Sequence, residues 1–296
     1  MRRHTVHAEC TLLEWLKTHA DAAALADGRV FLDQPGKKPT RMRELDAQRV
    51  LQMGWQVRIA DAHASAVSTL RLIEQRDGYL VADKPAGIPT IPDQRGAAQS
   101  LLAHVARYLK LPIERVHPTS RLDREVSGIV VFALDARMRT LLADAREHGE
   151  YERTYLALST GVAPPQKNGM WDAPIGRGRT PTTRAVGGPD PAKALTHYRY
   201  LASAGQLHAW ALYPQTGRTH QLRVHAAHAG APLLGDSVYG GLARLGLPNG
   251  RMLAPGRVLL HAHRVRALGH EWLSPRPALF DELWAAAAGA EYPSDF

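Results

Sequence analysis

The sequence predicts a mixed α+β fold. Strand-like segments dominate its middle, helical segments lie between them, and residues 163–194 are rich in Gly, Pro and Arg, as in long loops around short strands. The chain has 296 residues, and at about 150 residues per domain this length suggests two domains. We expect a small N-terminal α/β module over residues 1–75 and a larger domain over residues 76–296.

The N-terminal module is expected to run in the order helix, strand, turn, strand. Loosely helical apolar spacing over residues 11–26 stops at Gly28, a short strand ends at Asp33, and a second strand covers residues 55–61. This order resembles a compact RNA-binding module of ribosomal proteins and RNA-modifying enzymes. A structural cap without RNA contacts is the alternative. Residues 62–72 are typical of a linker.

The larger domain is expected to alternate strands with helices. Residues 128–134 form a continuous apolar run, which predicts a strand buried on both faces, and Asp135 is a suitable N-cap for a helix that extends to residue 148 with Met138, Leu141 and Leu142 on its apolar face. The remaining expected elements are strands at 79–81 and 153–161, a hairpin at 196–214, and helices at 99–110, 216–230 and in the Ala-rich tail.

The chain is strongly basic. It contains 37 Lys and Arg against 28 Asp and Glu, a net charge of +9. Residues 1–75 hold 11 basic and 9 acidic residues, so an excess of +7 lies in the larger domain. A basic surface suits a polyanion such as nucleic acid, although a solvated surface without a partner has the same composition.

Cysteine content and hydropathy exclude several classes of protein. Cys10 is the one cysteine, so an internal disulfide or a cysteine-based zinc site is excluded. No apolar run reaches the roughly 18 residues of a membrane span, and the basic N-terminus lacks the apolar region of a secretory signal. We therefore expect a cytoplasmic protein that does not enter a membrane.

Two polar segments stand out as candidate sites. In residues 121–128, Asp123 lies between Arg121 and Arg124 just before the buried strand. Nearby guanidinium groups keep a carboxylate ionised, so that it can serve as a nucleophile or base, although an Asp that caps a turn would look the same. In residues 216–225, Arg218 and Arg223 lie at an expected helix start, which could hold a phosphate or simply be a solvated face.

Histidine spacing raises a metal hypothesis that the sequence does not support. His220, His225 and His228 lie close together, and His261 and His263 follow later. No pair of histidines four residues apart with an intervening Glu occurs, and no cysteine pair is available. We therefore expect no metal site.

Residues 121–134, RLDREVSGIVVFAL, resemble the catalytic loop of the RluA family of RNA pseudouridine synthases, whose pattern is His-Arg-Leu-Asp-Arg-x-Thr-Ser-Gly. The resemblance covers about residues 76–296. The other family blocks follow in the family order: DKPAGIPTIP from Asp83, RTYLAL from Arg153, AKALTHYRYL from Ala192, residues 212–241, and LLHAHRV from Leu259.

The resemblance implies an isomerase that converts a specific uridine of structured RNA into pseudouridine. Asp123 matches the nucleophile, Tyr155 the tyrosine that stacks on the base and is a candidate for proton transfer, and Arg223 the arginine that pairs with the nucleophile. The family fold is a long mixed, mostly antiparallel sheet with a central cleft. No cofactor or metal is implied, and neither is an obligatory protein partner, so we expect a monomer.

The resemblance also implies RNA contacts. Arg121 matches a residue that helps to hold the opened RNA, and Arg218 is a candidate phosphate contact, as are Lys84 and Arg124. Ribosomal RNA is the favoured substrate and transfer RNA the alternative.

The chain departs from the family pattern at Ser120, where His is usual, and at Val126, where Thr is usual. Two other classes of function compete with the isomerase: a non-catalytic RNA-binding or RNA-chaperone protein and a histidine-metal hydrolase. Release of tritium from RNA that contains 5-tritiated uridine distinguishes the isomerase from the RNA-binding protein, and metal content tests the hydrolase.

Overall fold

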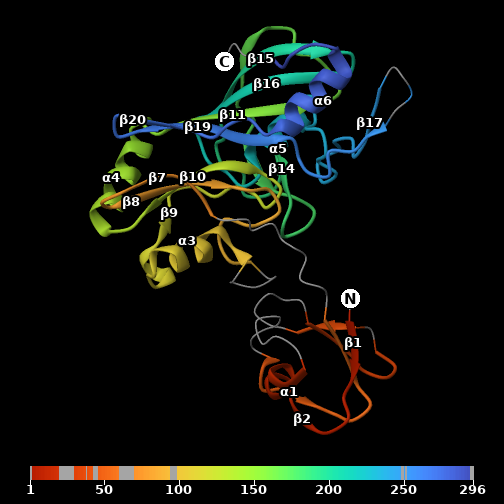
Figure 1. The fold of residues 1–296 in the computed structure, drawn as a ribbon. Coiled ribbons are helices and arrows are strands. Elements are labelled where there is room, and N and C mark those ends of the chain that lie inside the picture. The colour runs from red at the N-terminus through yellow and green to blue at the C-terminus, as the bar shows by residue number, and fades with distance from the viewer. Residues whose placement is uncertain are drawn as a thin grey trace. The chain divides into compact units, whose positions relative to one another are not determined.

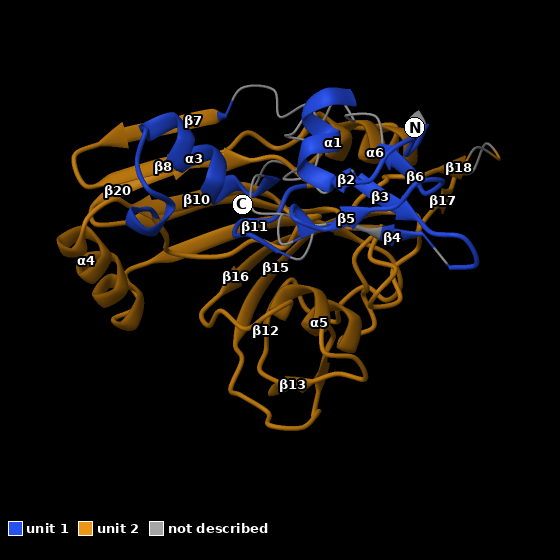
Figure 2. Cartoon of the chain, turned by 90° about the horizontal axis from the view of Figure 1, so that it is seen from below, with its two compact units in different colours: residues 1–70, 88–116 blue, residues 71–87, 117–296 orange. Residues whose placement is uncertain are grey.

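The computed structural model describes residues 2–19, 30–37, 39–42, 46–59, 70–93, 99–247, 250 and 252–293. The chain divides into two compact units (Figures 1 and 2). Unit 1 comprises residues 1–70 and 88–116, and unit 2 comprises residues 71–87 and 117–296.

Unit 1 contains a small antiparallel sheet and its own apolar core. Helix α1 is capped at its start by Thr11 and Glu14, whose side chains each bind the other residue's backbone N–H. Trp15 and Leu16 of this helix are buried with the apolar side chains of the sheet. The elements are β1 (Arg2–Thr5), β2 (Cys10–Thr11), α1 (Leu12–His19), β3 (Val30–Asp33), β4 (Thr40–Arg41), β5 (Val50–Leu51), β6 (Gln56–Ile59), α3 (Leu101–Leu109) and the 3-10 helix η3 (Ile113–Arg115).

Unit 2 is built on a ten-stranded sheet whose main order is β12-β15-β16-β11-β19-β10-β8-β7, with β20 beside β19 and β9 beside β10. All of its pairs are antiparallel except β10 with β19. The expected mixed, mostly antiparallel sheet is therefore confirmed. Its strands are β7 (Arg71–Arg76), β8 (Tyr79–Lys84), β9 (His117–Pro118), β10 (Ser127–Ala133), β11 (Glu152–Ser159), β12 (Asn168–Trp171), β15 (Thr196–Ala204), β16 (Leu207–Pro214), β19 (Leu260–Ala267) and β20 (His270–Leu273).

The parallel pair of strands lies in the middle of this sheet and depends on one glycine. Gly128 of β10 has φ +116°, and a Cβ atom there would lie 2.2 Å from the carbonyl oxygen of Ala262 in β19. Any other residue would push the two strands apart. Every residue of β10 is buried, as its apolar run predicts. The loop before β10 is thus attached to a fully buried strand in the middle of the sheet.

Helices and short hairpins complete unit 2. Helix α6 (Ala278–Ala288) packs Phe280 and Trp284 against leucines of β11 and β16, while α4 (Ala136–Glu147) packs beside β8 and β10 (Figure 1). Helix α5 (Gln221–His228) follows β16 and contacts β14. The remaining strands are short and pair as β13 (Ile175–Arg177) with β14 (Arg184–Val186) and β17 (Leu245–Gly246) with β18 (Met252–Leu253).

Most expected elements occur, and two differ from expectation. The first helix is described as Leu12–His19, and the end expected at Gly28 lies outside the described residues and stays a prediction. Leu141 of α4 is 39% exposed rather than part of its apolar face. Helix α5 begins at Gln221 rather than near Thr216, because His220 adopts a left-handed conformation with φ 58° and interrupts helical geometry.

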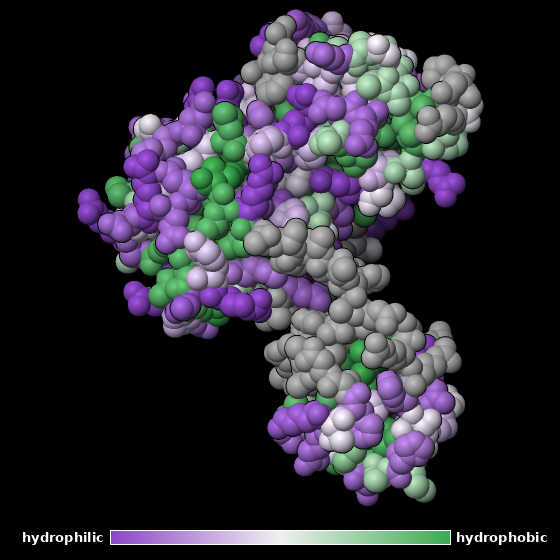
Figure 3. Space-filling view, viewed as in Figure 1, coloured by the Kyte–Doolittle hydropathy of each residue, from purple (hydrophilic) through white to green (hydrophobic). Residues whose placement is uncertain are grey.

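Hydrophilic residues cover most of the visible surface of unit 2 in Figure 3. Exposed large apolar side chains include Val162, in the loop after β11, and Met170, on β12. In the described part of the chain, no helix is both long and apolar enough to cross a bilayer. The surface therefore suits contact with water or with a charged partner.

Candidate active site

The catalytic-loop motif forms a tight turn directly before β10. The backbone N–H of Val126 donates to the carbonyl oxygen of Asp123 at 3.1 Å, which closes the turn. Val126 itself is 2% exposed, whereas the side chain of Asp123 is 22% exposed. The turn therefore buries its apolar residue and leaves the carboxylate accessible.

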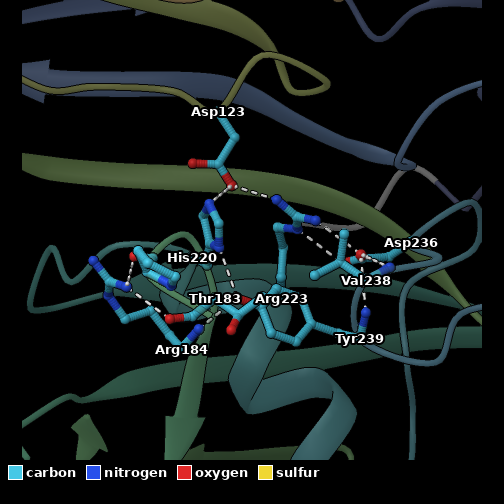
Figure 4. Close-up of polar contacts among 9 residues, drawn as sticks. Asp123, Thr183, Arg184, His220, Arg223, Asp236, Val238 and Tyr239 are labelled. Atoms are coloured by element: carbon cyan, nitrogen blue, oxygen red, sulfur yellow. Dashed lines mark hydrogen bonds and ion pairs between the residues drawn. The ribbon is translucent and has the colours of Figure 1, made fainter. Parts of the chain in front are cut away.

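Arg223 of α5 holds this carboxylate in place. Its Nη1 donates to Oδ2 of Asp123 at 2.9 Å, although the two residues are 100 positions apart in the chain (Figure 4). Its Nε and Nη2 donate to the two carboxylate oxygens of Asp236 at 2.7 and 2.8 Å. One guanidinium therefore bridges two carboxylates, a geometry that its fork of donors permits and a lysine could not reproduce.

Asp236 is the buried anchor of this arrangement. It is 1% exposed, and its Oδ1 also accepts the backbone N–H groups of Val238 and Tyr239. Burial disfavours the charged form of Arg223, but the two carboxylates outweigh this effect and raise the pKa of Arg223 above its ordinary value. Asp236 was not among the residues predicted from the sequence, although it lies in the family block of residues 212–241.

His220 approaches the same carboxylate oxygen of Asp123 as Arg223 does, with Nε2 at 3.7 Å from Oδ2 (Figure 4). Its Nδ1 is 2.7 Å from the hydroxyl of Tyr239, which also accepts the backbone N–H of Arg184 at 3.0 Å. The tyrosine hydroxyl can then donate its one proton to Nδ1, which assigns the imidazole proton to Nε2, facing Asp123. Burial lowers the pKa of His220, so a neutral ring is favoured at pH 7.

The turn before α5 is organised by the side chain of Gln221. Oε1 of Gln221 accepts the hydroxyl of Thr216 and the backbone N–H of Arg218, and Nε2 donates to the carbonyl oxygen of Leu195. Arg218 precedes the helix, so the sequence-based placement of Arg218 on the helix face is wrong. Its side chain is exposed and donates to the carbonyl oxygen of Lys193.

Tyr155 lies on β11, opposite Leu212 and next to the β-bulge between Thr154 and Tyr155. It is 7% exposed. Burial raises its pKa, and the negative charge of Asp123 adds to that effect, so the two side chains share one environment. The structure therefore pairs Asp123 with Arg223, and it places Tyr155 within electrostatic range of Asp123.

The other expected RNA contacts differ in exposure. Arg121 is exposed, and Arg124 is half-buried with its guanidinium bound to the carbonyl oxygen of Gly87. Lys84 is 0% exposed, and its ammonium donates to the carbonyl oxygens of Pro85 and Arg124. A fully enclosed ammonium has no surface for a phosphate, so the expected RNA contact of Lys84 is wrong. Lys84 instead connects two loops by hydrogen bonds inside the protein.

Burial of Lys84 has a consequence for the pH dependence of stability. Desolvation, with help from Arg257, lowers the pKa of Lys84 to about 7. From pH 7 towards 10 the unfolded chain binds a proton here that the folded chain does not. This one group should therefore raise the free energy of unfolding by at most about 1.4 kcal/mol per pH unit. Urea unfolding at pH 7 and 9 should show this rise in the wild type and a smaller rise in Lys84→Met. Equal rises in the two proteins would contradict the shift.

The histidines named in the metal hypothesis have structural partners. His225 contacts the Thr196 hydroxyl and the Ala173 carbonyl oxygen, and His261 contacts the Ser127 hydroxyl at 2.9 Å. Among the described residues, no three His, Cys, Asp or Glu side chains are grouped as metal ligands.

The departure from the family pattern at Ser120 is accommodated by packing. Ser120 is 9% exposed and bonds to the hydroxyl of Tyr151, which Thr119 also contacts at 2.9 Å. Ser120 thus takes part in a buried hydroxyl cluster beside the loop.

Comparisons with known proteins identify the family of this chain. Residues 78–228 match the family model described as RNA pseudouridylate synthase. The chain is 34% identical over 245 residues to the Bacillus subtilis protein YhcT, named an uncharacterized RNA pseudouridine synthase, and the match covers 80% of this chain and 74% of that one. It is 30% identical to ribosomal large subunit pseudouridine synthase D of Pseudomonas aeruginosa, with 94% of this chain and 86% of the relative covered.

The fold also matches a solved structure. Human RNA pseudouridylate synthase domain containing 4 aligns with a TM-score of 0.59 at 23% identity, over 76% of this chain and 95% of the human one. This likeness concerns the fold, and the family assignment depends on the sequence matches. Because the family model covers half of the chain and the relatives extend over most of it, this chain belongs to the RluA family of RNA pseudouridine synthases, which are isomerases.

Proposed function

We propose that this chain isomerises a uridine of ribosomal RNA and uses Asp123 as the nucleophile. The observation that carries the proposal is the bridge from Arg223 to both Asp123 and Asp236. It orients a partly exposed carboxylate beside the central strands of the sheet. A positioned, ionised carboxylate is what attack on a sugar carbon or removal of a sugar proton requires.

The reaction exchanges one bond of the target nucleotide for another. The bond from ribose C1′ to uracil N1 breaks, the detached base turns, and C1′ bonds to C5. The proton on C5 leaves, and N1 gains a proton. Asp123 acts at the ribose, either by adding to C1′ or by promoting elimination. The target uridine must first leave its stack, at a cost of a few kcal/mol.

The name of one relative favours large-subunit ribosomal RNA as the substrate of this chain. The matched Pseudomonas aeruginosa protein is named for the ribosomal large subunit, and it aligns with 94% of this chain, which includes most of unit 1. We propose that residues 1–75 bind RNA and direct the enzyme to its site. The cytoplasmic location and the monomeric state stay predictions.

Mapping pseudouridines in ribosomal RNA from cells with and without this protein tests the substrate. We expect one or more large-subunit sites to disappear on deletion and to return with the wild-type gene but not with Asp123→Asn. Loss of a transfer RNA site alone would overturn the ribosomal assignment. Unchanged RNA, together with no tritium release from 5-tritiated uridine RNA, would favour a non-catalytic RNA-binding protein.

Tyr155→Phe tests the role of the tyrosine hydroxyl. The ring that stacks on the base is retained, so RNA binding should stay within about twofold of the wild type. The hydroxyl is lost as a proton relay, and we expect RNA to accumulate in which the glycosidic bond has broken but pseudouridine has not formed. Nucleoside analysis of digested RNA measures both species. Normal pseudouridine formation would limit Tyr155 to stacking.

Arg121 and Arg218 are proposed to contact RNA in different ways. Arg218→Ala should flatten the slope of log affinity against log salt by about 0.7 to 0.9, the value of one phosphate, with little effect on the single-turnover rate at saturating RNA. Arg121→Ala should slow that rate, because it is proposed to support the opened RNA. If Arg218→Ala leaves the salt dependence of RNA affinity unchanged, Arg218 does not contact a phosphate. If Arg121→Ala changes the affinity but not the single-turnover rate, Arg121 does not support the opened RNA.

A further inference from the structure

A second polar pocket lies within unit 2 where β11 begins and β16 ends. Its volume is about 290 Å³, and it is lined by residues of α4, β11, β15, β16 and β19. Three of the lining side chains are arginines: Arg146, Arg153 and Arg264. The one acidic lining residue, Glu152, has a side chain that is 65% exposed and lies 4.0 Å from Arg266. The pocket is therefore strongly basic.

Arg153 supplies the observation that indicates a missing ligand. It is 8% exposed, and its Nη2 donates to the carbonyl oxygens of Pro214 and Thr216. Its Nε is buried and has no hydrogen-bond partner among the described residues, and no carboxylate in the described part of the chain lies within 4.0 Å of its guanidinium. A buried guanidinium without an anion is costly, so the site favours an anionic ligand.

Arg146 brings a second guanidinium to the same place. Gly217 makes room for it, because a Cβ atom there would lie 2.6 Å from Nη2 of Arg146 and 3.5 Å from Nη1 of Arg153. Burial lowers the pKa of Arg146, and repulsion from Arg153 lowers it further. A bound anion would reduce the electrostatic repulsion between two like charges that lie this close together.

The pocket is connected to both halves of the active site. Arg146 donates to the carbonyl oxygen of Thr119, four residues before Asp123, and Arg153 binds that of Thr216, four residues before His220. Arg153 is also two residues before Tyr155 on β11, and its charge acts on the pKa of that tyrosine. An anion in the pocket would thus lie beside the loop and the helix that carry the candidate catalytic groups.

We propose that Arg146, Arg153 and Arg264 form a phosphate-binding pocket that holds the RNA backbone next to the target uridine. The ligand chemistry is a phosphate, to which guanidinium groups donate paired hydrogen bonds. RNA is taken as its source on the basis of the proposed function. Holding a neighbouring phosphate would fix the strand while the uridine turns out of its stack.

Arg264 is the most suitable residue for a test, because it is half-buried and its guanidinium donates to the hydroxyl of Thr154 at 3.3 Å. Its matched control is Arg266, two residues further along β19, which is 51% exposed and ion-paired with Glu271. Arg264→Gln and Arg266→Gln remove the same charge from the same strand. Binding of a fluorescein-labelled RNA hairpin is measured over a series of salt concentrations, and thermal unfolding confirms that each variant is folded.

We expect Arg264→Gln to flatten the log–log salt slope by about 0.7 to 0.9 and Arg266→Gln to leave it near the wild-type value. Arg146→Gln should behave like Arg264→Gln. If Arg146→Gln fails to fold, Arg264→Gln alone decides the result. Two results would contradict the proposed phosphate site. One is the same salt slope in Arg264→Gln as in the wild type, and the other is the same decrease in slope in Arg264→Gln and Arg266→Gln.

Titration with inorganic phosphate, followed by phosphorus NMR, separates the two sources of the ligand. If phosphate binds to the wild type and the RNA slope is unchanged in Arg264→Gln, the site serves a free anion and the RNA assignment is overturned. These binding experiments require no turnover. If the protein forms no pseudouridine but the salt slopes change as expected, the phosphate-binding pocket is supported and the proposed isomerase function is contradicted.

Discussion

Asp123→Asn should abolish turnover while RNA binding stays within about twofold of the wild type. The amide has the shape of the carboxylate, and its oxygen can still accept the Nη1 hydrogen of Arg223, so the loop should keep its position. It lacks the negative charge that attack on the ribose, or removal of its proton, requires, and loss of a nucleophile typically lowers rates by several orders of magnitude. Tritium release under multiple-turnover conditions measures the effect.

Glu125→Gln is the matched control for this variant. Glu125 lies two residues further along the same loop, is half-buried, and loses the same charge on substitution. It should retain most of the activity. Sustained turnover by Asp123→Asn, in protein shown by mass spectrometry to be free of deamidation, would remove Asp123 as the nucleophile.

Arg223→Ala should damage both stability and activity. It leaves Asp236, 1% exposed, as a buried carboxylate without its guanidinium, which typically costs about 3–5 kcal/mol of the free energy of unfolding. It also releases Asp123 from its orientation, so the single-turnover rate should fall by a factor of at least about 100. Arg223→Lys should recover only part of either property, because an ammonium cannot bridge both carboxylates with the same geometry.

A double variant separates the two effects. In Arg223→Ala with Asp236→Ala the buried charge is gone, so part of the lost stability should return in urea unfolding, whereas activity should not return. Recovery of activity together with stability would mean that Arg223 acts only through folding. Near-normal activity of Arg223→Ala at a temperature where it is folded would contradict the pairing role.

Local sequence patterns predicted the elements that carry the site. The apolar run after Gly128 and the Asp135 cap depend on neighbouring residues, and both occur as expected. Helix α5 was predicted with a start that is too early, because the left-handed conformation of His220 is set by its contacts with Tyr239 and Asp123 rather than by its sequence neighbours. The buried position of Lys84 was missed for a related reason: a lysine in a turn is usually solvated, whereas here its ammonium also contacts a loop 40 residues away at Arg124.

The sequence by itself determined the family through its collinear blocks, and the resemblance to that family predicted the mostly antiparallel sheet and the residues proposed for chemistry. Only the tertiary structure decided how those residues meet. The bridge from Arg223 to Asp123 joins positions 100 residues apart, and Asp236, 13 residues from Arg223, completes it from another loop. The basic pocket around Arg153 likewise collects side chains from five elements. Long-range contacts of this kind depend on the pairing and register of distant strands, which no local pattern encodes.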